Sequence, residues 1–188
     1  MLFMRTNKMG MRGTRGNRNA DALDNGIYKS IDDIIRLAEK EGYYNGKKLQ
    51  VVKLAKYFGL NVVEKNFEQN ISGKLVIGKG PESPSVIYVN SNHSENRKRF
   101  TIAHELGHFI NHRKDGAEFE DTVFFRKGDI FGIEYSANKF AADILMPESE
   151  VRKSVIEGIR DVGSLAEEFG VSASAMKYRL EQLGFRLI

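Results

Sequence analysis

The chain has 188 residues, of which 41% are hydrophobic and 29% charged, and it contains no cysteine. This length suits one compact domain with a real hydrophobic core. Without cysteine there are no disulfides, thiolate zinc sites or thiol catalysis, so any metal must be held by histidine and carboxylate groups. No apolar run reaches the length of a membrane span and no signal peptide is recognisable, so we expect a soluble cytoplasmic protein with no membrane partner.

The net charge of +4 is unevenly distributed along the chain. Five of the 29 basic residues and none of the 25 acidic ones lie within residues 1–20, which leaves 24 basic against 25 acidic residues in the rest. Residues 1–26 are rich in Gly, Asn, Arg and Met and have no apolar period, which predicts a disordered basic tail. Such a tail can contact nucleic acid, but a solvated end is the commoner reason for one, and we adopt that interpretation.

Two amphipathic helices are predicted after the tail. Ser30, with Asp33 three residues later, is typical of a helix start, and apolar residues follow at helical spacing. A second helix is predicted near residues 48–58, where Gly59 suits the C-terminal cap. Both helices have the pattern of packing elements, so we assign no chemistry to them.

Three short β-prone runs follow, at residues 60–64, 74–77 and 86–89, separated by Gly and Pro turn residues. They predict a small, mainly antiparallel sheet in front of the helix that comes next. An extended substrate could pair with an edge strand of such a sheet. A sheet that merely covers a helix gives the same pattern, so the strands alone do not indicate a function.

Residues 97–112 carry the strongest functional signal in the chain. Apolar residues recur there every three or four positions, which predicts a helix. Within it, residues 104–108 read His-Glu-Leu-Gly-His, an H-E-x-x-H motif. Residues four apart lie one above the other on a helix, so His104 and His108 can reach one Zn²⁺ while Glu105 lies beside its open coordination position. Burying two imidazoles without a ligand would be unfavourable, which argues against a chance occurrence.

A catalytic zinc site normally has three protein ligands and one water, so a further ligand must come from elsewhere. A metzincin would place a third histidine six residues after His108, but that residue is Lys114. His112 continues the four-residue series, yet it lies roughly 12 Å along the helix from His104, too far to share one ion. The third ligand is therefore expected to be a carboxylate on another segment.

Glu134 is the best candidate for this carboxylate. It opens a predicted helix over residues 134–146, stopped by Pro147, whose small apolar residues permit close packing against the motif helix. Asn138, four residues later on the same face, could orient a metal ligand by a hydrogen bond. Asp143 is the second choice. The remaining acidic candidates fall in loop-like sequence: Glu118, Glu120, Asp121 and Asp129.

These residues predict a mechanism for peptide-bond hydrolysis. Zn²⁺ lowers the pKa of its bound water, and Glu105 accepts the proton and passes it to the leaving amine. A second donor that stabilises the oxyanion is also expected. His93, His112 and Tyr135 all remain open for that role.

Several segments together resemble the ImmA/IrrE family of zinc metallopeptidases. They are RFTIAHELGHF at 99–109, ExxANxFAA at 134–142 and LMP at 145–147, and residues 71–74 and 87–90 are similar to the family's sheet region. The likeness covers about residues 30–185, with the motifs in the same order and spacing. Ser136, where many relatives carry Glu, is a small departure that affects no ligand.

The resemblance implies Zn²⁺ ligands at His104, His108 and Glu134, with Glu105 as the catalytic residue. It implies an α+β fold, a minimal thermolysin-like zincin core with a small C-terminal helical module. It also implies a cytoplasmic endopeptidase of a bacterium or mobile element, which cleaves a helix-turn-helix transcriptional repressor and so derepresses its target genes. The alternative is a non-proteolytic, zinc-containing regulator that binds DNA or a partner protein.

Residues 159–188 form the predicted C-terminal module. Residues 165–172, followed by 175–183, have the small residue, turn glycine and second helix of a helix-turn-helix. Residues 161–188 contain four acidic against three basic side chains, a poor footprint for DNA, so we favour a packing or protein-contact role. The predicted domains are thus the tail at 1–26, a metallopeptidase domain at 27–158 and this module. The sequence does not predict an oligomeric state.

Overall fold

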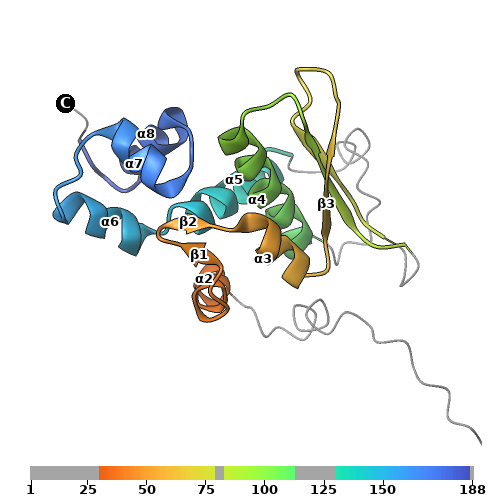
Figure 1. Ribbon diagram of the computed structural model, residues 1–188, viewed down its shortest axis with the longest axis horizontal. Coiled ribbons are helices and arrows are strands. Elements are labelled where there is room, and N and C mark those ends of the chain that lie inside the picture. Colours follow the sequence, from red (N-terminus) through yellow and green to blue (C-terminus); the bar gives the residue numbers. More distant parts are fainter. Residues whose placement is uncertain (1–29, 79–82, 113–129, 187–188) are drawn as a thin grey trace, which may run out of the picture.

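The computed structural model describes residues 30–78, 83–112 and 130–186. These residues form seven helices and two small sheets, so the predicted α+β class is confirmed (Figure 1). The predicted basic tail lies outside the described residues. Within the described ranges, every helix is too short or too polar to span a membrane.

The first helix starts as the sequence predicts. The structure has these N-terminal elements: α2 (Ile31–Lys40), β1 (Tyr44–Asn45), β2 (Lys48–Leu49) and α3 (Val51–Tyr57). The Asp33 backbone N–H donates to Ser30 Oγ at 3.2 Å, and the Ser30 N–H donates to the Asp33 carboxylate at 3.0 Å, which completes a capping box. The second helix begins at Val51 and not near 48, because β2 pairs with β1 as an antiparallel ladder. Gly59, at φ 84°, follows the end of α3 in the left-handed conformation typical of a cap.

A three-stranded sheet is formed by β3 (Asn61–Lys65), β4 (Gly73–Val76) and β5 (Val86–Asn90), in the order β3-β5-β4. The expectation of a mainly antiparallel sheet is wrong for one of the two strand pairings: β4 and β5 are antiparallel, but β3 and β5 are parallel. The three strands alternate in direction along the chain. Since β5 enters between the other two, it runs the same way as β3. This order leaves β4 as an edge strand among the described strands.

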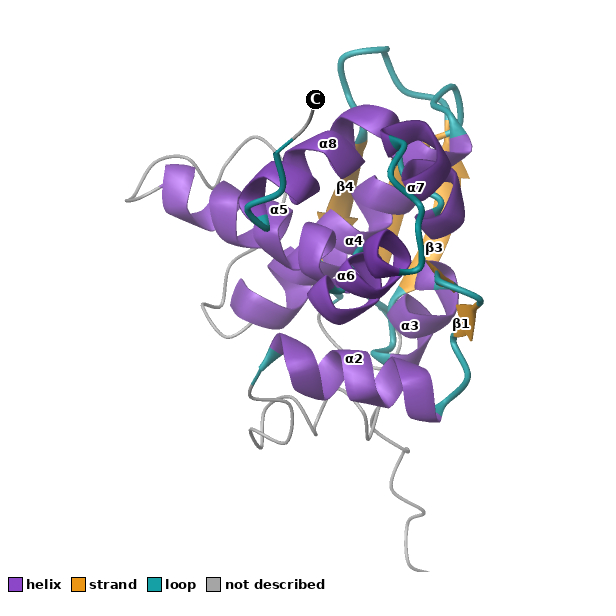
Figure 2. Cartoon of the chain, turned by 90° about the vertical axis from the view of Figure 1, so that its left-hand side faces the viewer, coloured by secondary structure: helices purple, strands orange, loops and turns teal. Residues whose placement is uncertain are grey.

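Two long helices, α4 (Glu95–His112) and α5 (Ile130–Leu145), occupy the middle of the molecule. They pack against each other, and α4 also contacts α3, β4 and β5 (Figures 1 and 2). Gly107 permits the close approach, because a Cβ there would lie 3.0 Å from Phe140 Cδ1 and 3.2 Å from Phe140 Cβ. The helix α5 begins four residues earlier than predicted and ends, as expected, just before Pro147.

Three shorter helices follow: α6 (Glu148–Ile156), α7 (Val162–Phe169) and α8 (Ala173–Gln182). The sequence did not predict α6, whereas α7 and α8 match the expected helix pair. Gly170 joins them at φ 64°, in the left-handed conformation expected for the turn glycine. The pair lies on the opposite side of α4 from the three-stranded sheet (Figures 1 and 2). Its apolar side chains belong to the same hydrophobic cluster as those of α4 and α5.

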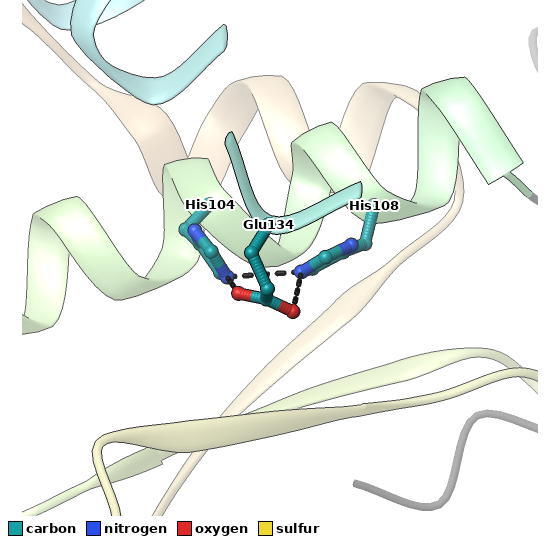
Figure 3. Close-up of side chains that lie close together, drawn as sticks. All are labelled: His104, His108 and Glu134. Atoms are coloured by element: carbon teal, nitrogen blue, oxygen red, sulfur yellow. Dashed lines mark hydrogen bonds and ion pairs between the residues drawn. The ribbon is translucent and has the colours of Figure 1, made fainter. Parts of the chain in front are cut away.

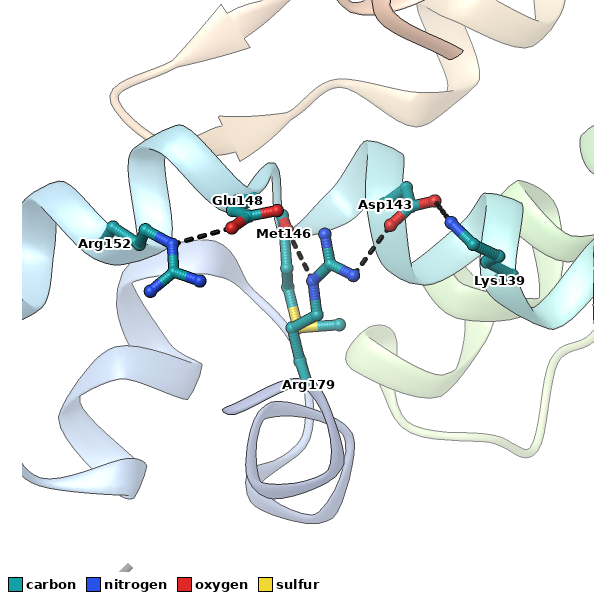
Figure 4. Close-up of polar contacts among 6 residues, drawn as sticks. All are labelled: Lys139, Asp143, Met146, Glu148, Arg152 and Arg179. Atoms are coloured by element: carbon teal, nitrogen blue, oxygen red, sulfur yellow. Dashed lines mark hydrogen bonds and ion pairs between the residues drawn. The ribbon is translucent and has the colours of Figure 1, made fainter. Parts of the chain in front are cut away.

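Buried polar contacts attach the α7–α8 pair to the rest of the fold. Arg179 of α8 binds Asp143 of α5 at 2.7 Å and donates to the Met146 carbonyl at 3.0 Å (Figure 4). From α4, Arg99 donates to the Gly170 carbonyl at 2.9 Å. The turn and the second helix of the pair are therefore turned toward the core.

Candidate metal centre

Three side chains from α4 and α5 converge at one point. His104 and His108 lie on successive turns of α4, and Glu134 reaches them from α5 (Figure 3). The two histidine Nε2 atoms are 2.9 Å apart. One carboxylate oxygen of Glu134 lies 3.4 Å from His104 Nε2 and the other lies 3.4 Å from His108 Nε2. Within the described ranges, this is the cluster whose ligand atoms lie near enough to hold one metal ion, all within 4.8 Å of one another.

The donor set and its spacing fit a divalent metal. Ligands that surround a tetrahedral Zn²⁺ at 2.0–2.1 Å are separated by roughly 3.3–3.5 Å. The two 3.4 Å nitrogen–oxygen distances match this spacing, and the 2.9 Å nitrogen–nitrogen distance is somewhat shorter. Two imidazoles and one carboxylate are also a ligand set of catalytic zinc sites. His104, His108 and Glu134 are thus the groups that could hold the metal.

The electrostatics of the cluster favour a cation. Hydrogen bonds from His104 and His108 hold the pKa of Glu134 far below its usual range, so this carboxylate is ionised. Burial lowers the pKa of His104, but the hydrogen bond to Glu134 and the charges of Glu105 and Glu134 outweigh it and raise this pKa overall. Both shifts share one cause, which is the attraction between the Glu134 carboxylate and the neighbouring imidazoles.

Asn138 orients one of the histidines. Its Oδ1 lies 3.0 Å from His104 Nδ1, one turn of α5 beyond Glu134. Because an amide oxygen can only accept, this contact places a proton on Nδ1, so Nε2 is the nitrogen that could bind a metal once its own proton has left. The position predicted to orient a ligand therefore makes such a contact.

Glu105 is buried and borders the same cleft as the three ligand candidates. The cleft has a volume of about 700 Å³. One face of α4 lines it over about three turns, from Arg97 through Phe100 and Thr101 to His108. The opposite wall is formed by Phe67 and by residues 70–74, which lead into β4.

The other predicted candidates lie elsewhere. Asp143, the second choice for the third ligand, is occupied by Arg179 and Lys139 and does not line the cleft. His93 and Tyr135 do not line it either: His93 Nε2 contacts the Gln69 carbonyl at 3.1 Å and Tyr135 is exposed. The side chain of His112, like the loop acids at 118, 120, 121 and 129, lies outside the described residues.

Sequence reasoning missed most of the cleft lining. Arg97, Phe100 and Thr101 precede His104 at three- and four-residue spacing, so the helical period could have identified them. The wall at residues 70–74 had no comparable signal, because only the sheet order places it opposite α4.

Comparisons with known proteins identify the fold and the family of the chain. A search of curated proteins found no match. A solved structure described as a Mycobacterium tuberculosis transcriptional regulator aligns with a TM-score of 0.59 and 20% sequence identity, over 88% of this chain and 51% of the other. This chain thus spans about half the length of that protein, and the likeness shows a shared fold. The family model of Peptidase M78, the IrrE N-terminal-like domain, matches residues 55–181, which is more than half of the sequence. The chain therefore belongs to the Peptidase M78 family.

Proposed function

We propose that this protein is a zinc-dependent endopeptidase that cleaves a helix-turn-helix transcriptional repressor in the cytoplasm and so derepresses its target genes. The observation that carries the proposal is the convergence of His104, His108 and Glu134 at one point of the cleft that Glu105 also borders. Membership of the Peptidase M78 family supports the same activity.

Each residue of the site has a distinct task in this proposal. His104, His108 and Glu134 hold the metal, and Asn138 keeps His104 in the tautomer that presents Nε2. When bound, Zn²⁺ would supply Lewis-acid polarisation of the scissile carbonyl and would acidify water. Glu105 is the catalytic residue, which accepts a proton from the attacking water and delivers it to the leaving amine. Its burial strengthens these proton transfers, because little bulk water competes at its carboxylate.

The shape of the cleft supports a polypeptide substrate. Its α4 face extends from Arg97 to His108, a rise of roughly 16 Å at 1.5 Å per residue. That length would accommodate about five residues of an extended chain. Gly73 and Lys74, at the start of the edge strand β4, form part of the opposite wall, where a substrate backbone could pair with the strand.

The proposed architecture is a minimal zincin core, over residues 27–158, with the helix-turn-helix-like pair at 159–188 as a packing module. The alternative, a non-proteolytic regulator that binds DNA, receives less support from the charges. Arg179 of α8 is buried against Asp143 and is not available to phosphates. The guanidinium of Arg99 on α4, beside the turn between the helices, is likewise engaged, because it donates to the Gly170 carbonyl.

The test is the Glu105→Gln variant, co-expressed with each helix-turn-helix repressor whose gene is found beside that of this protein. We expect one zinc ion per chain in both proteins and repressor cleavage reduced by at least about 100-fold in the variant. Glu181→Gln, which changes an exposed carboxylate on α8, is the matched control and should cleave normally. An intact repressor after incubation with the zinc-loaded wild-type protein would contradict the proposal, as would equal cleavage by the Glu105→Gln variant.

A further inference from the structure

The loop between β3 and β4, residues 66–72, lies beside the start of α4 at one end of the sheet (Figure 1). Four of its residues line the cleft: Phe67, Asn70, Ile71 and Ser72. Its two large apolar side chains, Phe67 and Ile71, do not belong to the hydrophobic cluster of the described residues. Core packing therefore contributes little to the shape of this loop, which depends on polar contacts instead.

Asn90, the last residue of β5, supplies such contacts. Its side chain is fully buried, and its Nδ2 donates to the Ile71 carbonyl at 2.8 Å and to the Glu68 carbonyl at 2.9 Å. Its Oδ1 accepts from the Asn92 backbone N–H at 3.0 Å, and its own backbone N–H donates to the Ser72 carbonyl at 2.9 Å. Asn90 thus holds three carbonyl groups of the loop, although it does not itself line the cleft.

An amide group suits this position because it combines two N–H donors with an acceptor on one short, planar side chain. Asp has the same shape but cannot donate when it is ionised. Ala would leave the Glu68 and Ile71 carbonyls without their buried donor. Loss of the amide would therefore release the loop, while β5 itself stays paired with β3 and β4.

Two further contacts tie the loop to its surroundings. Asn92, which is exposed, donates from Nδ2 to Asn66 Oδ1 at 2.7 Å. Arg97 of α4 donates to Ser72 Oγ at 3.0 Å, which joins the end of the loop to the helix that carries the two histidines of the site. Asn90 and Asn92 thus anchor the loop from the segment that leads out of β5, and Arg97 anchors it from α4.

We propose that Asn90 is a positioning residue for the substrate: it holds residues 66–72 as a preformed wall that a bound polypeptide contacts, with Asn92 as a weaker second anchor. The inference rests on the proposed endopeptidase function and assigns substrate affinity to a side chain that touches neither substrate nor metal. A wall that is formed in only a fraction of the molecules weakens binding in proportion to that fraction. Ligands that contact the wall should lose affinity without Asn90, whereas ligands that contact only the metal should not.

The experiment compares two kinds of probe on the zinc-loaded protein. Acetohydroxamate binds the zinc ion and has no peptide portion with which to contact the wall. Tripeptide hydroxamates of Leu and Phe, with the hydroxamate at either end, extend from the ion in opposite directions. In Asn90→Ala, the affinity for the tighter tripeptide probe should fall by about 10-fold, and that for acetohydroxamate should stay within about twofold. Isothermal titration calorimetry measures both affinities.

Two other variants complete the design. Asn92→Ala removes the exposed anchor and should lower the affinity for the tripeptide probe by about threefold. It decides the question if Asn90→Ala does not fold. Ser154→Ala is the matched control, because Ser154 is also fully buried and hydrogen-bonded but does not line the cleft, so it should bind both probes as the wild-type protein does.

Unchanged affinity for the tripeptide probe in the folded variants would overturn the inference. An equal loss for both probes would overturn it too, as would a wild-type protein that binds neither tripeptide more tightly than acetohydroxamate. A wild-type protein that takes up no zinc would instead overturn the proposed function.

Cleavage of the repressor supplies a second measurement. In Asn90→Ala, KM should rise by about 10-fold while kcat stays within about twofold, because the metal ligands and Glu105 are unchanged. A lower kcat with an unchanged KM would contradict a positioning role for Asn90. If the zinc-loaded wild-type protein leaves the repressor intact, the proposed function fails, and the two hydroxamate affinities still decide whether Asn90 forms the wall.

Discussion

The α4–α5 and α7–α8 helix pairs both bury polar side chains, but they use them differently. In α7–α8, Arg179 is buried in contacts with Asp143 and the Met146 carbonyl, so its polar groups are used by the fold. In α4–α5, His104 and His108 direct their Nε2 atoms at each other and at Glu134, beside a cleft. A buried polar group thus indicates a functional site when its neighbours are other groups that can bind a metal. It indicates a structural role when its neighbours satisfy its charge and hydrogen bonds.

The comparison predicts that substitutions in the two pairs will separate metal binding from stability. Glu134→Gln should have the largest effect on the metal. Removal of a charged ligand should weaken zinc affinity by well over about 100-fold, the upper end for residues that only orient a ligand. The unfolding midpoint of the metal-free protein should fall only slightly, because the lost contacts with His104 and His108 involve a side chain that is 40% exposed to solvent. Competition with a chromophoric chelator measures the affinity, and unchanged binding would remove Glu134 from the ligand set.

Arg179→Met should have the opposite profile. It leaves Asp143 buried with Lys139 as its remaining partner, so the free energy of unfolding should fall by about 3 kcal/mol. Zinc affinity should stay within about twofold, because neither residue borders the metal site. Urea denaturation measures the change in the free energy of unfolding. The double variant Arg179→Met/Asp143→Leu should recover most of the loss, and failure to recover it would mean that more than the ion pair is lost.

Asn138→Ala should weaken zinc binding by about 10-fold, the lower end for a residue that orients a ligand, since it removes the acceptor for His104 Nδ1. Asn138→Asp keeps that acceptor and should retain the affinity of the wild-type protein or exceed it. Isothermal titration calorimetry measures the zinc affinity of both variants. Similar losses in both would show that the position serves packing only.

The smallest effect is expected at Asp161, which caps α7. Hydrogen bonds from Ser164 lower the pKa of its carboxyl group, so the charged cap stabilises the folded state above the unfolded pKa of about 4. That contribution is lost as the pH falls through the lower folded pKa. Asp161→Asn keeps a good cap without charge, so the wild-type protein should be slightly more stable at pH 7, and this advantage should be smaller at pH 3. Chemical denaturation of the metal-free protein at both pH values tests this, and a pH-independent difference would contradict it.

The sequence could predict the ligand candidates because local geometry determines their relation. The four-residue interval of His104 and His108 fixes their common face on any helix, and the same interval links Glu134 to Asn138. Which acid faces the histidines depends on how α5 packs, and the small residues of α5 supplied that clue. These positions remain predictions of function, although the structure brings them together.

Other features depend on contacts between distant segments. The parallel pairing of β3 with β5 follows from the insertion of β5 between two earlier strands, which no local pattern encodes. The helix α6 escaped prediction because its buried positions, Val151 and Ser154, are too few to give an apolar period. The cleft wall at residues 70–74 required the sheet order as well.

The contact between Gly107 and Phe140 bears on which ions the site accepts. It fixes the spacing of α4 and α5 one residue before His108, at residues that do not line the cleft. A larger ion, such as Cd²⁺ or Ca²⁺, needs longer ligand bonds and would have to push apart a pair of helices whose remaining surfaces are already packed. Ion size would then be discriminated by the hydrophobic core and not by the ligands themselves, so the radius limit could be relaxed by trimming Phe140.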